Sequence, residues 1–178
     1  MDFKTLAEEI EKATKMAFEE MFEKHQAENI YSFALYSDEG AMTVCPSLNT
    51  LSFLNSLREE EDLYYYKFEP AEWKYEAVGA EKAFDTICYT LRTVLEKSNY
   101  DEAQFSHFRS QLFETCIQTL KKLKDEDYFK NIIGEDIFLL FTVSDDGFAQ
   151  EAMTNIVSML NSNPYKDEYL TWMKTWEE

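Results

Sequence analysis

Glycine and proline are scarce in this sequence, with four glycines and three prolines among 178 residues. That scarcity excludes low-complexity linkers and collagen-like or repeat architectures. Hydrophobic residues make up 45% of the chain and aromatic residues 16%, which is enough apolar material for a folded core. One domain is the natural organisation for a chain of this length, so we predict a single domain over residues 1–178.

Cysteine and histidine are also rare. Cys45, Cys88 and Cys116 are far apart in apolar settings, which predicts small buried side chains in a reducing compartment without disulfides. His25 and His107 have no partner at a spacing typical of a zinc site or a catalytic pair. The glycine-rich motifs of phosphate loops, dinucleotide sites and nucleophile elbows are missing. We therefore expect no metal, no cofactor and no recognisable catalytic residue.

Positive charge is low. Lysine and arginine total 17 against 35 aspartates and glutamates, for a formal net charge of −18. Such a charge repels nucleic-acid phosphates and anionic membrane surfaces, whereas it attracts a basic protein partner. The alternative is that the acidity only keeps the protein in solution. The chain has no apolar run of the roughly 20 residues that span a bilayer and no secretory leader pattern, so we expect a cytoplasmic protein.

Apolar residues at steps of three and four predict several helices. The predicted helices cover residues 2–26, 49–57, 80–98, the segment that follows a capping Asp101, 148–160 and 165–176. The short connection through Asn99 and Tyr100 predicts that the two long helices beside it form an antiparallel hairpin.

The apolar period changes to two at Ile30, which predicts a strand over Ile30–Tyr36. Residues 37–40 form a turn, and Met42–Cys45 return as the second arm of a hairpin. Pro46 is expected to end that arm, because proline cannot donate a hydrogen bond to a sheet.

Two further apolar segments have strand character. The aromatic run Leu63–Phe68 is β-prone, and residues 136–143 predict a strand buried on both faces and therefore central. Between them, Pro70 suits the first position of a short helical turn, and Trp73 is expected against the core. The element order predicts an α+β fold, with a small, mainly antiparallel sheet of three or four strands packed with several helices.

Four residues form a possible ligand site. Asp145 and Asp146 follow the most apolar strand, where carboxylates can bind Mg²⁺ or act as acid and base, although aspartates are also common in turns. Glu72 precedes Trp73, and a carboxylate against an indole in a dry pocket can act as an acid. The alternative is that Trp73 only fills the core while Glu72 pairs locally.

An acidic run next to a tyrosine run predicts a partner-binding surface. Tyrosines bury a large area with few rotatable bonds, and flanking carboxylates suit an arginine- or lysine-rich partner. The alternative is a strand with one face in the core and the other face partly exposed to solvent. The predicted partner-binding residues are Glu59, Glu60, Glu61, Asp62, Tyr64, Tyr65 and Tyr66.

Three stretches of the chain carry a family resemblance: residues 33–50, residues 65–76 with the Pro-Ala-Glu-Trp run at 70–73, and residues 143–146 together with 161–164. Over most of its length the chain resembles a bacterial family catalogued as domain of unknown function 4303. Lys67 stands where the resemblance leads us to expect arginine, and Ser162 with Asn163 interrupts a tighter Leu-Asn-Pro ending. The family has no established activity, so the resemblance assigns no catalytic residue.

Two functions follow as alternatives. The first is a non-enzymatic interaction protein that binds a basic protein partner through the acidic and aromatic surface. Small acidic families of this style often resemble the immunity proteins of bacterial toxin systems, which makes a toxin one form of that partner. The second is a metal-dependent hydrolase or small-ligand-binding domain, which requires Asp145, Asp146 and Glu72 to converge in one pocket.

Overall fold

The computed structural model describes residues 1–58, 62–144 and 148–177. Within these ranges the sheet has four strands in the order β3-β2-β1-β4. Strand β1 pairs antiparallel with β2 and parallel with β4, while β2 pairs antiparallel with β3. The predicted α+β class is confirmed, and the sheet is mixed because β4 runs parallel to β1. The strands are β1 (Ile30–Ser37), β2 (Cys45–Thr50), β3 (Tyr75–Glu76) and β4 (Phe138–Val143).

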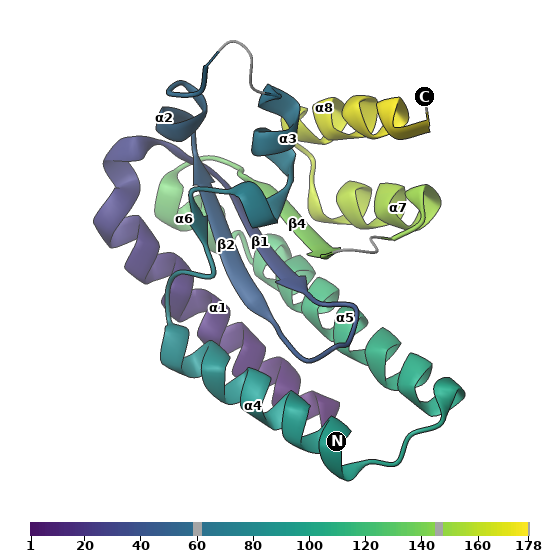
Figure 1. Cartoon of the computed structure of the whole chain (residues 1–178). Helices are drawn as coiled ribbons and strands as arrows, with labels where there is room; N and C mark the ends of the chain where they lie inside the picture. Colours follow the sequence, from purple (N-terminus) through teal and green to yellow (C-terminus); the bar gives the residue numbers. More distant parts are fainter. Residues whose placement is uncertain (59–61, 145–147, 178) are drawn as a thin grey trace.

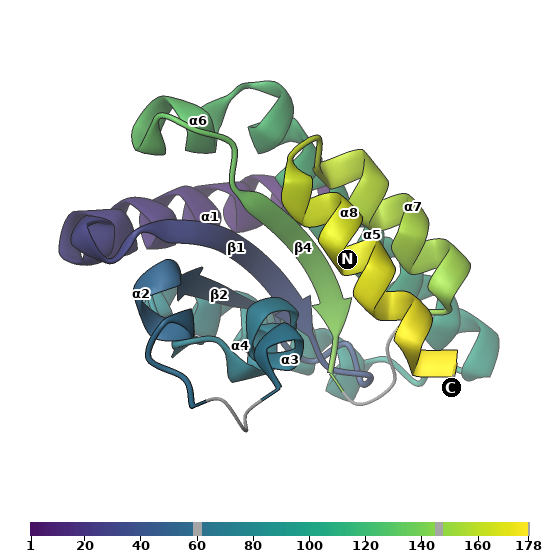
Figure 2. The ribbon, with the colours of Figure 1, turned by 90° about the horizontal axis from the view of Figure 1, so that it is seen from above.

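Helices surround this sheet (Figures 1 and 2). The α-helices are α1 (Phe3–His25), α2 (Leu51–Leu54), α3 (Leu63–Phe68), α4 (Glu81–Lys97), α5 (Glu102–Asp125), α6 (Tyr128–Ile133), α7 (Gln150–Leu160) and α8 (Pro164–Met173), and the 3₁₀ turns are η1 (Gln26–Glu28), η2 (Pro70–Glu72) and η3 (Lys174–Glu177). Most predicted helices are confirmed. The one expected over 49–57 is shorter, because residues 49 and 50 belong to β2. In the described ranges, no helix is long and apolar enough to cross a membrane.

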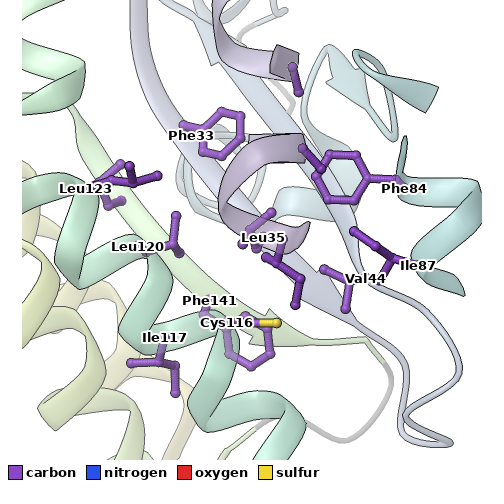
Figure 3. Close-up of a cluster of buried hydrophobic side chains, with 14 of the residues drawn as sticks. Phe33, Leu35, Val44, Phe84, Ile87, Cys116, Ile117, Leu120, Leu123 and Phe141 are labelled. Atoms are coloured by element: carbon purple, nitrogen blue, oxygen red, sulfur yellow. The ribbon is translucent and has the colours of Figure 1, made fainter. Parts of the chain in front are cut away.

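The larger core lies on one face of the sheet. Phe33 and Leu35 of β1 point into it, as does Phe141 of β4, and helices α1, α4, α5 and α6 cover it (Figure 3). Asp101 caps α5 as expected, in a reciprocal capping box with Gln104. Helices α4 and α5 each pack against α1. The predicted hairpin between them is wrong, because their apolar faces both meet α1 instead of each other.

A smaller core lies on the opposite face. Ala34 of β1 and Phe138 of β4 point into it, and they pack against Phe68, Trp73 and side chains of α7 and α8. Trp73 is only 3% exposed, which confirms that it packs in the core.

The second arm of the hairpin was predicted at Met42–Cys45, but the strand that pairs with β1 is β2, which begins at Cys45. Strand β2 passes through Pro46, which is paired with Leu35, and the Pro46 carbonyl accepts a hydrogen bond from Ala77 N at 3.0 Å. The N and O atoms of one strand residue point to the same side. The side of Pro46 that lacks an N–H therefore faces away from β1 and toward β3. Because β3 is only two residues long, proline is tolerated there.

The aromatic run Leu63–Phe68 is a helix, not the expected strand. The Asp62 side chain caps it by accepting hydrogen bonds from Tyr64 N at 3.0 Å and Tyr65 N at 3.1 Å. Phe68 then packs edge-on against Phe138, with ring centroids 5.3 Å apart. Capping and burial therefore override the β propensity of the tyrosines.

Strand β4 is buried along its whole length, as predicted, but it is an edge strand and not central. Helix α7 packs against it, and the side chain of Asn161 bonds to its outer edge. The prediction of a central position from burial on both faces was wrong. Helix α7 and the Asn161 side chain cover the edge that a fifth strand would have covered.

Candidate functional site

The Pro-Ala-Glu-Trp segment starts the candidate site, and its backbone is tied to the sheet. Pro70 occupies the first turn of η2, and the Glu69 side chain caps that turn by accepting from Ala71 N at 3.4 Å. The Ser47 hydroxyl of β2 donates to the Pro70 carbonyl at 2.8 Å. This buried hydrogen bond fixes the turn, and with it the two glutamates that flank it.

Helix α3, just before this turn, is anchored in the same way. The Asn49 side-chain amide of β2 donates to the Tyr66 carbonyl at 2.9 Å and to the Tyr31 hydroxyl at 3.1 Å. The Tyr31 hydroxyl donates to the Lys67 carbonyl at 2.7 Å. Residues 65–72 therefore stand on the sheet in one defined position.

A groove of about 490 Å³ lies between residues 65–72, the end of β4, the start of α7 and the C-terminal helices. Figure 1 shows α3 beside α8, and the T-shaped contact between Phe68 and Tyr169, at 5.3 Å, joins them. Strand β4 contributes Thr142 and Ser144 to the groove. We call it the acidic groove, and its aromatic and acidic lining residues are Tyr65, Phe68, Glu69, Glu72, Phe148, Tyr169 and Trp176.

Two carboxylates, those of Glu69 and Glu72, line the acidic groove. Neither Glu69 nor Glu72 forms an ion pair with any residue in the described ranges. Burial raises the pKa of Glu69, and the charge of Glu72 acts in the same direction. Burial, followed by the charges of the two glutamates, raises the pKa of Tyr65, whose hydroxyl donates to Glu72 Oε1 at 3.5 Å. The groove is therefore a place of concentrated negative charge.

Aromatic rings form one wall of the groove. Tyr169 is 2% exposed and touches Trp176 in a T-shaped contact at 6.3 Å. Trp176 is 48% exposed and contacts Trp172 at 4.9 Å. Burial raises the pKa of Tyr169, so its phenol stays neutral. The wall runs from a buried tyrosine to an exposed tryptophan at the rim.

Only part of the predicted ligand site can be placed. Glu72 lines the acidic groove, whereas Trp73 lies behind it in the smaller core. Asp145 and Asp146 lie outside the described residues. Ser144, which directly precedes them, lines the groove.

The predicted partner-binding surface is also placed in part. Tyr64 and Tyr65 are exposed on α3, and Tyr66 is half-buried against Phe53. Asp62 serves as the cap of α3. The remaining members, Glu59, Glu60 and Glu61, lie outside the described residues. Tyr65 contacts Glu72, so one residue of this surface and one of the ligand site share the acidic groove.

Sequence reasoning missed Glu69, Tyr169 and Trp176 as site residues. Glu69 could have been found, since a carboxylate directly before a proline-initiated turn is placed to cap it. Tyr169 packs on the domain, against Phe68 and Phe138.

Metal ligands are not gathered in the parts of the chain that the structure describes: residues 1–58, 62–144 and 148–177 contain no group of three His, Cys, Asp or Glu side chains that could hold an ion. The groove lining offers instead carboxylates, phenols and an indole. These groups bind cations bearing N–H donors or a flat charged face.

Comparison with known proteins identifies a family but no activity. A family model described as Domain of unknown function (DUF4303) matches residues 10–162, which is most of the chain and confirms the resemblance seen in the sequence. No curated protein and no solved structure matches.

Proposed function

The chain belongs to the family described as Domain of unknown function (DUF4303), and we propose that it is a protein-binding domain whose acidic groove receives a lysine or arginine side chain of a basic partner. The observation that carries this proposal is the pair of carboxylates, Glu69 and Glu72, that stand without a cationic partner among the described residues and between aromatic rings. In this function the protein binds and does not catalyse.

Arginine fits the groove chemistry well. A guanidinium can stack on a tyrosine or tryptophan face while its N–H groups bind a carboxylate in a bidentate pair. Trp176 and Tyr65 supply faces, and Glu69 and Glu72 supply acceptors. Burial raises the pKa of Glu69 and the charge of Glu72 adds to the rise, so a cation that enters the groove stabilises the ionised carboxylate.

Overall charge supports the same partner. A net charge of −18 draws basic proteins toward the surface and speeds their encounter, most strongly at low ionic strength. The groove then supplies the selective contact. In the immunity-like form of this function, the partner is a toxin whose basic surface the groove covers.

A second candidate function uses the same groove. Glu72 and Ser144 both line it, and Asp145 and Asp146 follow Ser144 in the sequence. A small-ligand or metal-dependent role that uses Glu72 in the groove differs from the first function in its ligand. Titration calorimetry with MgCl₂ separates the two, because bound Mg²⁺ favours the second function while a bound arginine-rich peptide favours the first.

The direct test measures binding of a fluorescent oligoarginine peptide at low salt. The E69Q/E72Q variant is compared with E8Q/E9Q, which removes two exposed carboxylates from α1 and so matches the change in net charge. We expect E69Q/E72Q to weaken binding about tenfold or more and E8Q/E9Q to change it little. Equal weakening by both variants would show that the peptide senses only overall charge, which contradicts the proposal.

The native partner is then sought with the same pair of variants as baits. Proteins captured by the wild type and by E8Q/E9Q, and lost with E69Q/E72Q, are partners of the groove. A W176A bait tests the aromatic wall separately, since it keeps both carboxylates.

A further inference from the structure

Two of the three cysteines meet in the structure although they are far apart in the sequence. Cys45 begins β2, and Cys88 lies in α4. The Cys88 sulfur accepts a hydrogen bond from Val44 N at 3.4 Å and donates to Val44 O at 3.5 Å. It therefore rests on the backbone of the residue directly before Cys45, and the two thiols are near enough for each to shift the pKa of the other.

The surroundings shift the pKa values of the two thiols in opposite directions. The neighbouring Cys45 thiol lowers the pKa of Cys88, and the Val44 N–H that bonds its sulfur and the nearby Arg92 act in the same direction. The neighbouring Cys88, together with burial, raises the pKa of Cys45. Cys88 is thus the thiol of the pair that loses its proton more readily.

Exposure sets this pair apart from the third cysteine. Cys45 is half-buried and Cys88 is 8% exposed, whereas Cys116 is 0% exposed in the larger core. Cys116 is also alone, and burial raises its pKa. A small oxidant therefore reaches the pair from the Cys45 side and does not reach Cys116 in the folded protein.

We propose that Cys45 and Cys88 form a reversible disulfide, with hydrogen peroxide as the oxidant. The Cys88 thiolate attacks one peroxide oxygen, the O–O bond breaks, and the departing hydroxide takes up a proton to leave as water. This step leaves a sulfenic acid on Cys88. The Cys45 sulfur then attacks the Cys88 sulfur, its proton and the hydroxyl leave as a second water, and the S–S bond forms.

The electrons balance in this sequence. The two thiols lose two electrons and two protons, and the peroxide is reduced to two waters. A low-molecular-weight dithiol restores both thiols by exchange through a mixed disulfide. The bond would close a covalent loop over residues 45–88, which contains Tyr65, Glu69 and Glu72, and it would restrict the unfolded chain.

Peptide mapping of the full-length, folded protein tests the proposal. After a brief treatment with hydrogen peroxide, free thiols are alkylated and the digest is analysed by mass spectrometry. We expect a Cys45–Cys88 cross-linked peptide that disappears on treatment with dithiothreitol. Cys116 should react with the alkylating reagent only after the protein is unfolded.

Single substitutions assign the roles. C45S should stop at the sulfenic acid on Cys88, which dimedone labels, and C88S should lose peroxide reactivity at Cys45. C116S should form the cross-link like the wild type. The proposal is overturned if wild-type Cys88 is recovered alkylated and without a cross-link after oxidation, or if the cross-link joins Cys116.

Discussion

The side-chain amide of Asn161 hydrogen-bonds both backbone polar groups of Leu139. Its oxygen accepts from Leu139 N at 2.8 Å, and its nitrogen donates to Leu139 O at 2.7 Å. Leu139 lies on β4, the edge strand of the sheet, and Asn161 is only 3% exposed. One side chain thus takes the place of a neighbouring strand and closes an edge that would otherwise hold unpaired groups.

Replacing Asn161 by alanine should leave both groups of Leu139 buried without partners. We expect N161A to lower the free energy of unfolding by about 2–4 kcal/mol, because each unsatisfied buried group costs about 1–3 kcal/mol. Urea denaturation followed by circular dichroism measures the loss. The exposed neighbour provides the control, and S162A should stay within about 0.5 kcal/mol of the wild type. An unchanged midpoint in N161A would show that water or the chain itself replaces the amide.

Gly79 and Gly134 form a matched pair for a second prediction. Both have positive φ, +99° and +98°, but a Cβ at Gly79 would meet Ala17 O at 3.1 Å and Met21 Cγ at 3.1 Å, while a Cβ at Gly134 would meet nothing within 4 Å. G134A should cost about 1–2 kcal/mol for the left-handed conformation alone. G79A adds steric overlap with α1 and should cost about 2–4 kcal/mol. Equal losses in urea denaturation would show that α1 moves aside freely.

Local patterns predicted the helices well because their signals are local. Apolar spacing marks α1, α4, α5 and α7, and the Asp101 cap sets the start of α5. The errors fall where distant contacts decide the structure. Pro46 continues β2 because the side of this residue that lacks an N–H faces the short strand β3. Leu63–Phe68 become helical because Phe68 is buried against β4 and α8.

The candidate site was half predictable for the same reason. Glu72 and Tyr65 stood out in the sequence as members of two separate groups. Their meeting with Trp176 depends on the packing of Phe68 against Tyr169, which joins α3 to a helix about a hundred residues later. The Cys45–Cys88 pair has the same origin, since only the packing of α4 beside the start of β2 brings the sulfurs together.

Glu28 leads to a prediction about acid stability. Its carboxylate accepts from Lys74 Nζ at 2.7 Å and from the Tyr75 hydroxyl at 2.7 Å, and it pairs with His25. The hydrogen bond from Lys74, with those from Tyr75 and His25, lowers the pKa of Glu28 to about 2. Because the folded pKa lies below the unfolded one, the stabilisation is present above the ordinary glutamate pKa of 4.5 and is lost as the pH falls toward about 2.

E28Q should therefore be less stable than the wild type at neutral pH, by about 1 kcal/mol for a partly exposed network. The difference should shrink as the pH falls from about 5 to about 2. Urea midpoints measured across that range check it. E23Q removes an exposed glutamate of α1 and controls for net charge. If the difference in urea midpoint between E28Q and the wild type does not change with pH, the result contradicts the role of the ionised Glu28 carboxylate.

For Glu69 the expected dependence of stability on pH has the opposite sign. Burial raises its pKa in the folded protein, so its contribution to stability is present below the unfolded pKa and is lost as the pH rises through the folded pKa. Glutamine keeps the acceptor that bonds Ala71 N and removes the buried charge. E69Q should thus have a higher urea midpoint than the wild type at neutral pH, and the advantage should vanish near about pH 4. The E8Q variant should show no such trend.

Stability and binding then separate the two possible roles of Glu69. A carboxylate that lowers stability but raises affinity is typical of a site that serves function at the expense of the fold. E69Q should therefore be more stable and yet bind oligoarginine more weakly, measured on the same preparation. If E69Q instead unfolds more readily at neutral pH, the Glu69 carboxylate serves the fold as the cap of η2. Glu69 is then not a charge held ready for a partner, and the proposed affinity of the acidic groove for a cation loses its basis.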